Sequence, residues 1–484
     1  MSNFVETSNR EEAIKYKFEL KECFLGEPEF YKKIAVIALP MIAQNTLSNI
    51  VGLLDNVMVG QVGKVPMSAV AIVNQILFIF YLCIWGSLAG AGIFSTQFFG
   101  KGDMDGVRHS LRFKLVTAIT LCTVAVTFLY FSSTWLISGY ISADVIDAER
   151  VETLKNGIAY LNIMLLGLLP FSLTQVYASA MRESGNTKLP MVAVMVAMVV
   201  NFIFNALLIF GLMGFPKMGV LGAAVATVIS RFVELSIVVF GAHRKGGSYT
   251  FFDGLYKGFY IPREMILPML SKTLPLLCNE FLWSFSQALL LKQYAVRGLS
   301  IIAAINISGT VAQIFNEVFL SIGGSTAIIV GQELGANKLI SARRTAWRMA
   351  ALSVASTIVM GLLLAIAAPF IPQIYNVDLE IKALAMKCIL VIAVCMPINA
   401  YANVTYFTIR SGGKTLITFA FDFFSAWFLS VPVAYVLCRH TALPIVTVYL
   451  IVGLLELVKC VVGFFLVKSG IWVRNIVVNE ESGN

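Results

Sequence analysis

Residues 188–242 of the chain are KLPMVAVMVAMVVNFIFNALLIFGLMGFPKMGVLGAAVATVISRFVELSIVVFGA. This stretch holds two long apolar runs, near residues 188–213 and 219–242, which a short glycine-containing turn separates. An α-helix rises about 1.5 Å per residue, so about 20 apolar residues cross the roughly 30 Å of hydrocarbon in a bilayer. The stretch therefore predicts two membrane-spanning helices joined by a tight turn.

Apolar runs of similar length recur on both sides of this pair. Of the 484 residues, 58% are hydrophobic and 13% are charged, and the mean hydropathy is +0.82. A soluble domain carries about 25% charged residues, so this composition excludes a water-exposed surface over most of the chain. The sequence predicts an all-α, polytopic membrane protein with twelve spans. The other ten are expected near 34–58, 68–99, 110–138, 156–182, 265–291, 301–333, 345–372, 383–409, 415–438 and 443–468.

The basic residues indicate how the chain is oriented. The net charge is +9, but Lys and Arg lie in short loops between the apolar runs rather than on one arm or face, which argues against a nucleic-acid partner. With both termini and the even-numbered loops in the cytoplasm, about 24 Lys and Arg lie inside and about 9 outside. Arg343 and Arg344 then fall inside, and an acidic loop that includes Asp144 falls outside. We therefore expect a multi-pass protein of the plasma (bacterial inner) membrane with cytoplasmic termini.

The second half of the chain repeats features of the first. Gln97 and Gly100 end the second span, and Gln332 and Gly335 end the eighth span with the same spacing between them. Each half has six spans, an even number, so both halves enter the membrane in the same sense and the repeat is parallel, related by a pseudo-two-fold axis. The expected organisation is a cytoplasmic leader at 1–33, an N-lobe at 34–242, a linker at 243–264, a C-lobe at 265–468 and a cytoplasmic tail at 469–484.

Charged side chains inside the spans need a partner or a function, because each costs several kcal/mol in hydrocarbon. Arg231 and Glu234 are three residues apart on one helix, as are Glu456 and Lys459 in the equivalent span, so each pair is expected to form an ion pair. Asp55 has no basic residue one turn away and lies about 31 Å along the first span, toward its outer end. Asp55 is therefore the leading candidate for a functional carboxylate.

Two asparagines of the fifth span are expected near Asp55. Asn201 and Asn205 are four residues apart and share a helix face, and Asn205 lies at a depth similar to that of Asp55. Carboxylate and carboxamide oxygens suit a hard alkali cation, and a carboxyl group shielded from water can also take up a proton. These residues predict a site for H⁺ or Na⁺ and no other cofactor. The alternative is that Asp55 only caps or hydrogen-bonds to a neighbouring helix.

Three other acids lie at membrane depth in the second half. Glu280, beside Asn279 in the seventh span, is a candidate for a second coupling site or for a counter-charge to a cationic substrate. Glu317 and Asp422 are isolated acids in the sequence, and each either lines a polar cavity or is a buried hydrogen-bonded group. Because the isolated charges are mostly acidic, we expect the transported substrate to be cationic or neutral.

Several segments resemble the multidrug and toxic compound extrusion (MATE) family, and the resemblance covers about residues 34–468. It implies two six-helix lobes that form a V and export organic cations in exchange for H⁺ or Na⁺. The segments are LPMIAQNTLSNIVGLLDNVMVG at 39–60, GAGIFSTQFFGKGD at 90–103, RESGNTKLP at 182–190, LPLLCNEFLW at 274–283 and IIVGQELGA at 328–336.

The resemblance also implies roles for individual residues. It implies an N-lobe cation site made of four residues, in which Asn205 stands where some members carry aspartate. In the C-lobe it implies a sodium site that includes Glu280, but the aspartate expected in the tenth span falls on Asn399. This departure removes a charge and favours proton coupling through Asp55. The four implied N-lobe residues are Asp55, Asn201, Asn205 and, early in the sixth span, Thr227.

Other functions fit the sequence less well. A flippase of the same superfamily, for a lipid-linked or polyanionic substrate, would present Arg and Lys in its central cleft, where the chain offers few. A membrane-embedded enzyme would need a catalytic group of residues, yet His109, His243 and His440 fall in loops, and no HExxH, GxSxG or phosphate-binding loop occurs. Carboxylates placed asymmetrically in the two halves argue against a passive channel. We expect a monomeric antiporter, not an enzyme, whose partners are small organic cations and the lipid bilayer.

Overall fold

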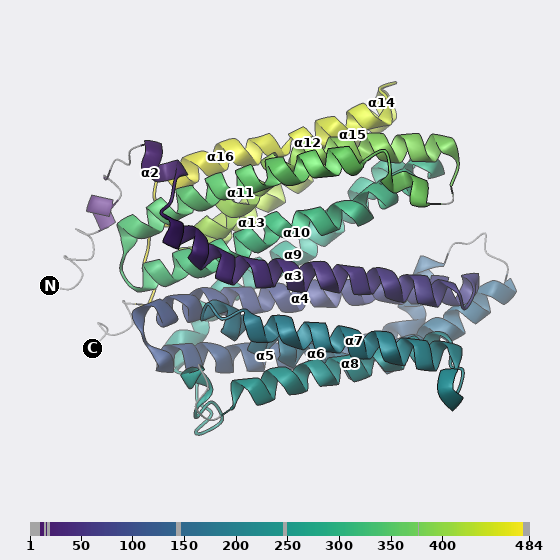
Figure 1. Cartoon of the computed structure of the whole chain (residues 1–484), viewed down its shortest axis with the longest axis horizontal. Coiled ribbons are helices and arrows are strands. Elements are labelled where there is room, and N and C mark those ends of the chain that lie inside the picture. Colours follow the sequence, from purple (N-terminus) through teal and green to yellow (C-terminus); the bar gives the residue numbers. More distant parts are fainter. Residues whose placement is uncertain are drawn as a thin grey trace. The chain divides into compact units, whose positions relative to one another are not determined.

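The computed structural model of the chain describes residues 10–13, 16, 20–141, 147–244, 249–375 and 377–477. Every regular element in these ranges is helical, which confirms the predicted all-α fold (Figure 1). Several segments named above lie outside the described residues: most of the predicted leader before residue 20, Asp144 of the acidic loop, residues 245–248 of the linker and residues 478–484 of the tail.

Twelve helical spans are long and apolar enough to cross a membrane, and they occur where the sequence predicts them. The first six are α3 (Pro28–Gly60), α4 (Lys64–Lys101), α5 (Met104–Tyr140), α6 (Asp147–Glu183), α7 (Lys188–Phe210) and α8 (Val220–Ala242). The next four are α9 (Arg263–Ala295), α10 (Leu299–Gly335), α11 (Leu339–Ala367) and α12 (Leu379–Ser411). The eleventh joins α13 (Thr415–Phe424), a π-helical segment (Ser425–Ser430) and α14 (Val431–His440), and the twelfth joins α15 (Ile445–Leu454) and α16 (Glu456–Lys468).

Most of the helices continue beyond the apolar runs that predict them. Two of the three histidines expected in loops therefore lie in helices: His109 is in α5, and His440 is the last residue of α14. His243, in contrast, directly follows the end of α8. The polar residues at the ends of the runs favour helix as well, so hydropathy alone underestimates the length of each helix.

The turn between α7 and α8 begins three residues earlier than the apolar run suggests. Gly211 has φ +73° and ends α7, and its N–H donates to Leu207 O at 3.0 Å. An L side chain rarely adopts this backbone conformation, so glycine is the residue that permits a sharp exit from the helix here. The N–H of Met218 then returns to Leu208 O at 2.8 Å, which closes the turn before α8.

The chain divides into two compact units, and the second comprises residues 43–92 and 104–267. In this unit α6 packs against α5 and α8, and α8 packs against α7 (Figure 1). The described part of the linker also folds onto it. Arg112 of α5 donates to four linker carbonyls at 2.9–3.1 Å, and Phe251 and Phe252 are fully buried. This part of the linker is thus a packed element with a short 3₁₀ turn, η2 (Thr250–Phe252).

Unit 1 comprises residues 1–42, 93–103 and 268–484. Its central helix is α12, which packs against α10, α11, α15 and α16. The first turns of α3 contribute to its apolar core, where Ile34 and Ile37 are buried with Ile328 and Ile329 of α10. The beginning of α3 and the end of α4 therefore pack with helices from the second half of the sequence.

The ends of α4 and α10 meet in a reciprocal contact. A Cβ on Gly100 would overlap the backbone of Gln332, and a Cβ on Gly335 would overlap the backbone of Gln97. Gln97 and Gln332 are equivalent residues of the two halves, as are Gly100 and Gly335. Each glycine therefore contacts the glutamine of the other half. This is the geometry that a pseudo-two-fold axis between two repeats imposes, and only glycine lets the two backbones approach so closely.

Residues 470–477 cover this contact after the last span. Gln97 donates to Ser411 O at 2.9 Å and accepts from the N–H of Ile476 at 2.8 Å. Asn475 donates to Gly335 O at 3.2 Å, and Trp472 is completely buried. Arg10 of the leader donates to Val473 O at 2.9 Å. The described ends of the chain therefore lie together on unit 1.

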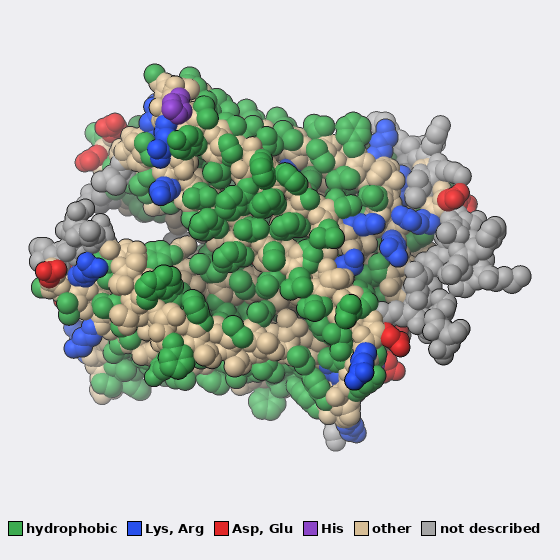
Figure 2. Space-filling view, turned by 180° about the vertical axis from the view of Figure 1, so that it is seen from behind, with side chains coloured by type: hydrophobic (Ala, Val, Ile, Leu, Met, Phe, Trp, Pro, Cys, Tyr) green, Lys and Arg blue, Asp and Glu red, His purple; other side chains and the backbone are tan. Residues whose placement is uncertain are grey.

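Hydrophobic and basic side chains are distributed over the surface as expected for a protein in a bilayer. Figure 2 shows hydrophobic side chains over the middle of the visible face, with Lys and Arg concentrated toward the ends of the helices. Large apolar side chains such as Phe131 and Phe240 are 80% and 77% exposed. In water such exposure is unfavourable, whereas lipid is the solvent that makes it stable.

Candidate functional site

Asp55 of α3 lies beside the two asparagines of α7. The Nδ2 of Asn205 donates to Asp55 Oδ1 at 2.5 Å and to Asn201 Oδ1 at 3.0 Å. Asn201 Nδ2 in turn donates to Thr227 Oγ1 of α8 at 3.3 Å. The structure thus joins the four residues predicted for cation coupling in one hydrogen-bonded chain across α3, α7 and α8. We call these residues the Asp55 cluster.

The asparagines of the Asp55 cluster are almost completely removed from solvent. Asn205 is 0% exposed and Asn201 is 4% exposed, whereas Asp55 and Thr227 are half-buried. The Oδ1 of Asn205 is buried and accepts no hydrogen bond from the described residues. An unsatisfied buried acceptor is unfavourable, so this oxygen is available to a cation or to a protonated group.

Arg231 of α8 is the base that interacts electrostatically with Asp55. Its guanidinium forms the predicted ion pair with Glu234 at 3.2 Å and lies over the ring of Phe171, 4.8 Å from the centroid. In the part of the chain that the structure describes, no base is close enough to Asp55 for an ion pair. Asp55 is therefore not locked to a permanent basic partner.

Two tyrosines that the sequence does not single out lie near the Asp55 cluster. Tyr160 of α6 is buried and interacts electrostatically with Asp55 and with Tyr81 of α4. The ring of Tyr81 lies 4.5 Å from that of Phe171, and Tyr81 interacts electrostatically with Arg231. Both tyrosines occur in otherwise apolar runs, where an aromatic residue is most often part of the core, so no spacing pattern marks them as neighbours of Asp55.

A second charged cluster lies in unit 1 around Lys459 of α16. The Nζ of Lys459 lies 3.0 Å from Glu456 Oε2, as the spacing predicts, and 3.1 Å from Asp422 Oδ1 of α13. The expectation that Asp422 is an isolated acid is therefore wrong. Its partner comes from a different helix, so the sequence around Asp422 does not reveal it.

Asn279 of α9 and Tyr406 of α12 also belong to this group. We call the whole group the Lys459 cluster, and its members are Asn279, Tyr406, Asp422, Glu456 and Lys459. Asn279 Nδ2 donates to Asp422 Oδ2 at 3.2 Å and lies 3.5 Å from the hydroxyl of Tyr406. Neither Asn279 nor Tyr406 is charged, and neither is predicted to be part of a site. Only tertiary packing brings them to Asp422.

The other residues predicted for the second site are not joined in one group. Glu280 interacts electrostatically with Asp422 and with Arg410. No hydrogen bond or ion pair joins Glu280 to Asn399 among the described residues, and α12 reaches the Lys459 cluster through Tyr406, two turns after Asn399. Glu317 is half-buried on α10 and has an interaction partner, so whether it lines a polar cavity or is a buried hydrogen-bonded group stays a prediction.

A third buried ion pair holds α5 to α6. Lys114 Nζ lies 2.6 Å from Glu183 Oε1 and 3.2 Å from Ser179 Oγ, and the Lys114 side chain is fully buried. This pair could not be predicted, because Lys114 lies near the beginning of its span and resembles a flanking charge. The two partners are far apart in the sequence and on different helices.

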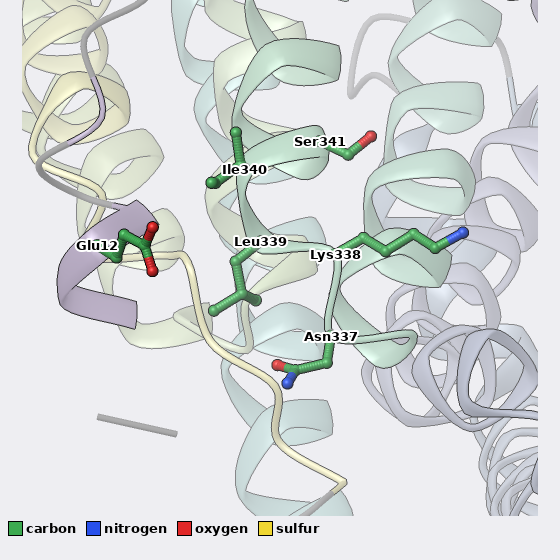
Figure 3. A pocket seen from close by; sticks show the side chains of 6 residues that line it. All are labelled: Glu12, Asn337, Lys338, Leu339, Ile340 and Ser341. Atoms are coloured by element: carbon green, nitrogen blue, oxygen red, sulfur yellow. The ribbon is translucent and has the colours of Figure 1, made fainter. Parts of the chain in front are cut away.

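A pocket of about 310 Å³ lies away from these clusters, at the turn between α10 and α11 (Figure 3). Glu12 of the leader faces this turn, and none of the lining residues belongs to the Asp55 or Lys459 cluster. The residues that line the pocket are Glu12, Asn337, Lys338, Leu339, Ile340 and Ser341.

The chain matches the family profile described as MatE twice, over residues 40–207 and over residues 275–436. The two matches begin at Pro40 and Pro275, whose separation along the chain equals that between Gln97 and Gln332. Together they cover more than half of the chain and confirm that its two halves are repeats of one unit.

Named relatives and solved structures also resemble the chain over most of its length. The chain is 26% identical to the "Probable multidrug resistance protein NorM" of Thermotoga maritima, over 94% of this chain and 96% of that protein. It is 24% identical to the "Probable multidrug resistance protein YoeA" of Bacillus subtilis, over 88% and 90%. A crystal structure of MATE in complex with MaL6 has a TM-score of 0.81 at 17% identity, with 93% of this chain and 97% of that chain covered. A Vibrio cholerae MATE transporter has a TM-score of 0.79 at 17% identity, over 91% and 96%. At these identities the solved structures show the shared fold.

Proposed function

The chain belongs to the MatE family and is a multi-pass multidrug efflux transporter, and from this premise we propose that it exchanges small organic cations for H⁺ by alternating access of its two lobes. Na⁺ is the alternative coupling ion. The lobes are the N-lobe at 34–242 and the C-lobe at 265–468, with the linker at 243–264 between them. The protein acts as a monomer in the plasma (bacterial inner) membrane, and both termini are cytoplasmic.

The observation that carries this proposal is the hydrogen-bonded chain of the Asp55 cluster. It joins a half-buried carboxylate to carboxamides and a hydroxyl on α3, α7 and α8. The carboxylate accepts from Asn205 when it is ionised, and its acceptor strength falls when it binds a proton or a metal ion. A change at Asp55 therefore changes the bonds that hold three helices together, as coupling of an ion to a conformational change requires.

The mechanism follows from this link. With Asp55 ionised and the cleft open to the cytoplasm, acidic and aromatic side chains attract the organic cation. After the lobes rock outward, ion binding at Asp55 removes part of that attraction and repacks α3 against α7 and α8, so the cation leaves. A coupling free energy of about 1–3 kcal/mol, or about 5- to 150-fold in affinity, is sufficient for such an exchange.

Aromatic rings near Asp422 support a cationic substrate. The rings of Phe285 on α9 and Trp427 are stacked with centroids 5.8 Å apart, and Phe423 lies 6.0 Å from Trp427. Aromatic faces attract organic cations. Flat, adaptable aromatic surfaces also tolerate cations of different shapes, which suits multidrug export.

The pairing of two intramembrane bases, Arg231 and Lys459, argues against a flippase for polyanionic cargo. Such a protein needs positive groups that are available to phosphate or carboxylate. Arg231 is bound to Glu234, and Lys459 is bound to two carboxylates. Bases neutralised in this way attract an anion weakly.

The described chain ends support the proposed orientation. Arg10 bonds to Val473, so the leader and the tail lie on the same side of unit 1. An even number of spans requires this arrangement, and the excess of Lys and Arg in the even-numbered loops favours the cytoplasm for that side.

The decisive experiment is efflux of a fluorescent organic cation from energised vesicles that contain the Asp55→Asn variant. Asparagine keeps the size of the side chain but neither ionises nor binds a proton. We expect gradient-driven efflux to fall at least about tenfold. The matched control is Asp378→Asn, which removes an exposed acid just before α12 and should leave efflux unchanged. Undiminished efflux by Asp55→Asn would refute the coupling role.

The same vesicles identify the coupling ion. A pH gradient and a sodium gradient are imposed separately, each with the other ion at equilibrium. We expect the pH gradient alone to drive efflux, because the Asp55 cluster contains a single carboxylate and neutral amide groups. Efflux driven by the sodium gradient alone would replace H⁺ with Na⁺ in the proposal.

A further inference from the structure

The Lys459 cluster holds an ammonium group between two carboxylates within membrane-spanning helices. Lys459 Nζ lies 3.1 Å from Asp422 Oδ1 and 3.0 Å from Glu456 Oε2. The side chains of Lys459 and Asp422 are only 12% and 18% exposed. Asn279 of α9 holds the other oxygen of Asp422, so the ammonium position is defined by α9, α13 and α16 together.

This position has the chemistry of a cation site. An ammonium ion offers three N–H donors, and here at least two of them meet carboxylate oxygens. Without the ammonium, Asp422 and Glu456 would present two charged oxygen ligands to the same point. Carboxylate oxygens are the ligands that hard cations prefer, so the Nζ of Lys459 stands where a free metal cation would bind.

The Asp55 cluster lacks such an internal cation. Its neighbouring base, Arg231, is bound to Glu234 on the same helix, and the bond that Asp55 accepts comes from the neutral amide of Asn205. In the second half, the base of the corresponding i, i+3 pair reaches a further acid on another helix, Asp422. The two halves thus share the intrahelical ion pair, but only in the second does the base also neutralise the acid of a neighbouring helix.

We propose that Lys459 is a resident cation, whose ammonium fills the cation position of the second half and excludes free alkali ions from Asp422 and Glu456. An ion can then exchange at the Asp55 cluster, whereas the positive charge of the Lys459 cluster is covalently tethered. Lys459 thus determines the ion stoichiometry and selectivity of transport. The role given to Asp55 rests on the proposed function, whereas the occupation of the second site by Lys459 does not.

The test is the substitution Lys459→Met in the purified full-length protein. Methionine matches lysine as far as Cε and lacks Nζ, so the substitution leaves the two carboxylates and vacates the ammonium position. The thermal midpoint Tm is measured in detergent over a series of NaCl concentrations, with choline chloride keeping the ionic strength constant. All proteins carry Asp55→Asn, so that the first cluster does not contribute a sodium response.

We expect the Tm of Lys459→Met to rise with NaCl by roughly 3 °C or more, because an ion that binds only the folded state stabilises it. The parent protein with Lys459 should show no such rise. Lys459→Arg keeps a positive charge in place and should also be insensitive to sodium. Adding Asp422→Asn to Lys459→Met removes one of the two charged ligands and should abolish the rise of Tm with NaCl.

Two results would overturn the proposal. One is a Lys459→Met protein whose Tm does not respond to sodium, and the other is a parent protein that responds as strongly as the variant. If Lys459→Met does not fold without alkali ions, sodium during solubilisation should restore a monodisperse protein in size-exclusion chromatography. A variant that stays aggregated in sodium would count against the proposal as well.

The outcome is separable from that of the proposed function. The sodium response of Lys459→Met is an equilibrium binding measurement that requires no transport. Normal efflux by Asp55→Asn would refute coupling at Asp55 and would leave the sodium response of Lys459→Met unchanged.

Discussion

In the proposed mechanism, Asn205 is the residue through which the Asp55 cluster transmits a change in charge. Its Nδ2 group bonds to both Asp55 and Asn201, and the side chain is completely buried. In this mechanism, ion binding at Asp55 weakens the bond from Asn205, because the carboxylate becomes a poorer acceptor. Because Asn201 continues the chain to Thr227, the effect reaches α8 through side chains that the bilayer and the protein shield from water.

Asn205→Leu tests this link at the level of one side chain. Leucine has a similar volume and removes both hydrogen bonds. A hydrogen bond to a charged group contributes about 1.5–3 kcal/mol, so we expect gradient-driven efflux to fall by about tenfold or more. Initial efflux rates in vesicles measure the effect, and Tm verifies that the protein is folded. Asn306→Leu on an exposed face of α10 is the control. Equal efflux from the two variants would contradict the role of Asn205.

Helical spacing and residue type suffice to predict Asp55, Asn201 and Asn205, whereas Thr227 is implied only by the resemblance to the MATE family. Asn201 and Asn205 share a face at any orientation of α7, and an acid without a local base marks Asp55. The Lys459 cluster could not be predicted in full. The partners of Asp422 lie on α9 and α16, and which faces of three helices meet depends on packing that no local pattern encodes.

At the level of elements, the twelve spans follow from hydropathy, but their ends depend on other physical chemistry. The turn after α7 shows the difference. Residues 211–213 are as apolar as the helix before them, yet the helix ends at Phe210 because Gly211 adopts a left-handed conformation. Where glycine permits such a turn, backbone geometry and not hydrophobicity determines where the helix stops.

Gly211→Ala should therefore destabilise the protein. An alanine in this conformation costs about 1 kcal/mol or more, and its Cβ would lie only 3.0 Å from Lys217 Cβ. We expect a lower Tm with little change in the efflux rate at moderate temperature. Gly139→Ala in α5, where a Cβ has nothing within 4 Å, is the matched control and should leave Tm equal or slightly higher. A Tm for Gly211→Ala that equals the control value would show that the turn tolerates a side chain.

At the level of the molecule, the sequence repeat becomes a physical contact. Gly100 and Gly335 lie against the backbones of Gln332 and Gln97, so equivalent residues of the two halves meet in unit 1. The constant spacing between equivalent residues could be read from the sequence, but the contact could not. A repeat establishes that two segments have the same structure, and it does not establish that they touch.

Gly335→Ala should disrupt this contact. The added Cβ would overlap the backbone around Gln97, which cannot move like the end of a flexible side chain, and overpacking of this kind costs about 1–3 kcal/mol or more. We expect a clear loss of folded protein in detergent, measured by fluorescence-detected size-exclusion chromatography. Gly309→Ala on α10, which has open space around its Cβ position, should behave like the unmodified protein. Equal yields of the two variants would contradict the close approach of the two backbones.

The bonds of Gln97 have a consequence for how the protein is made. One of its partners, the N–H of Ile476, lies 379 residues further along the chain. The ribosome therefore synthesises this partner only after it has synthesised every membrane-spanning helix. Until then the end of α4 lacks this hydrogen bond, and incompletely packed segments of this kind favour misfolding.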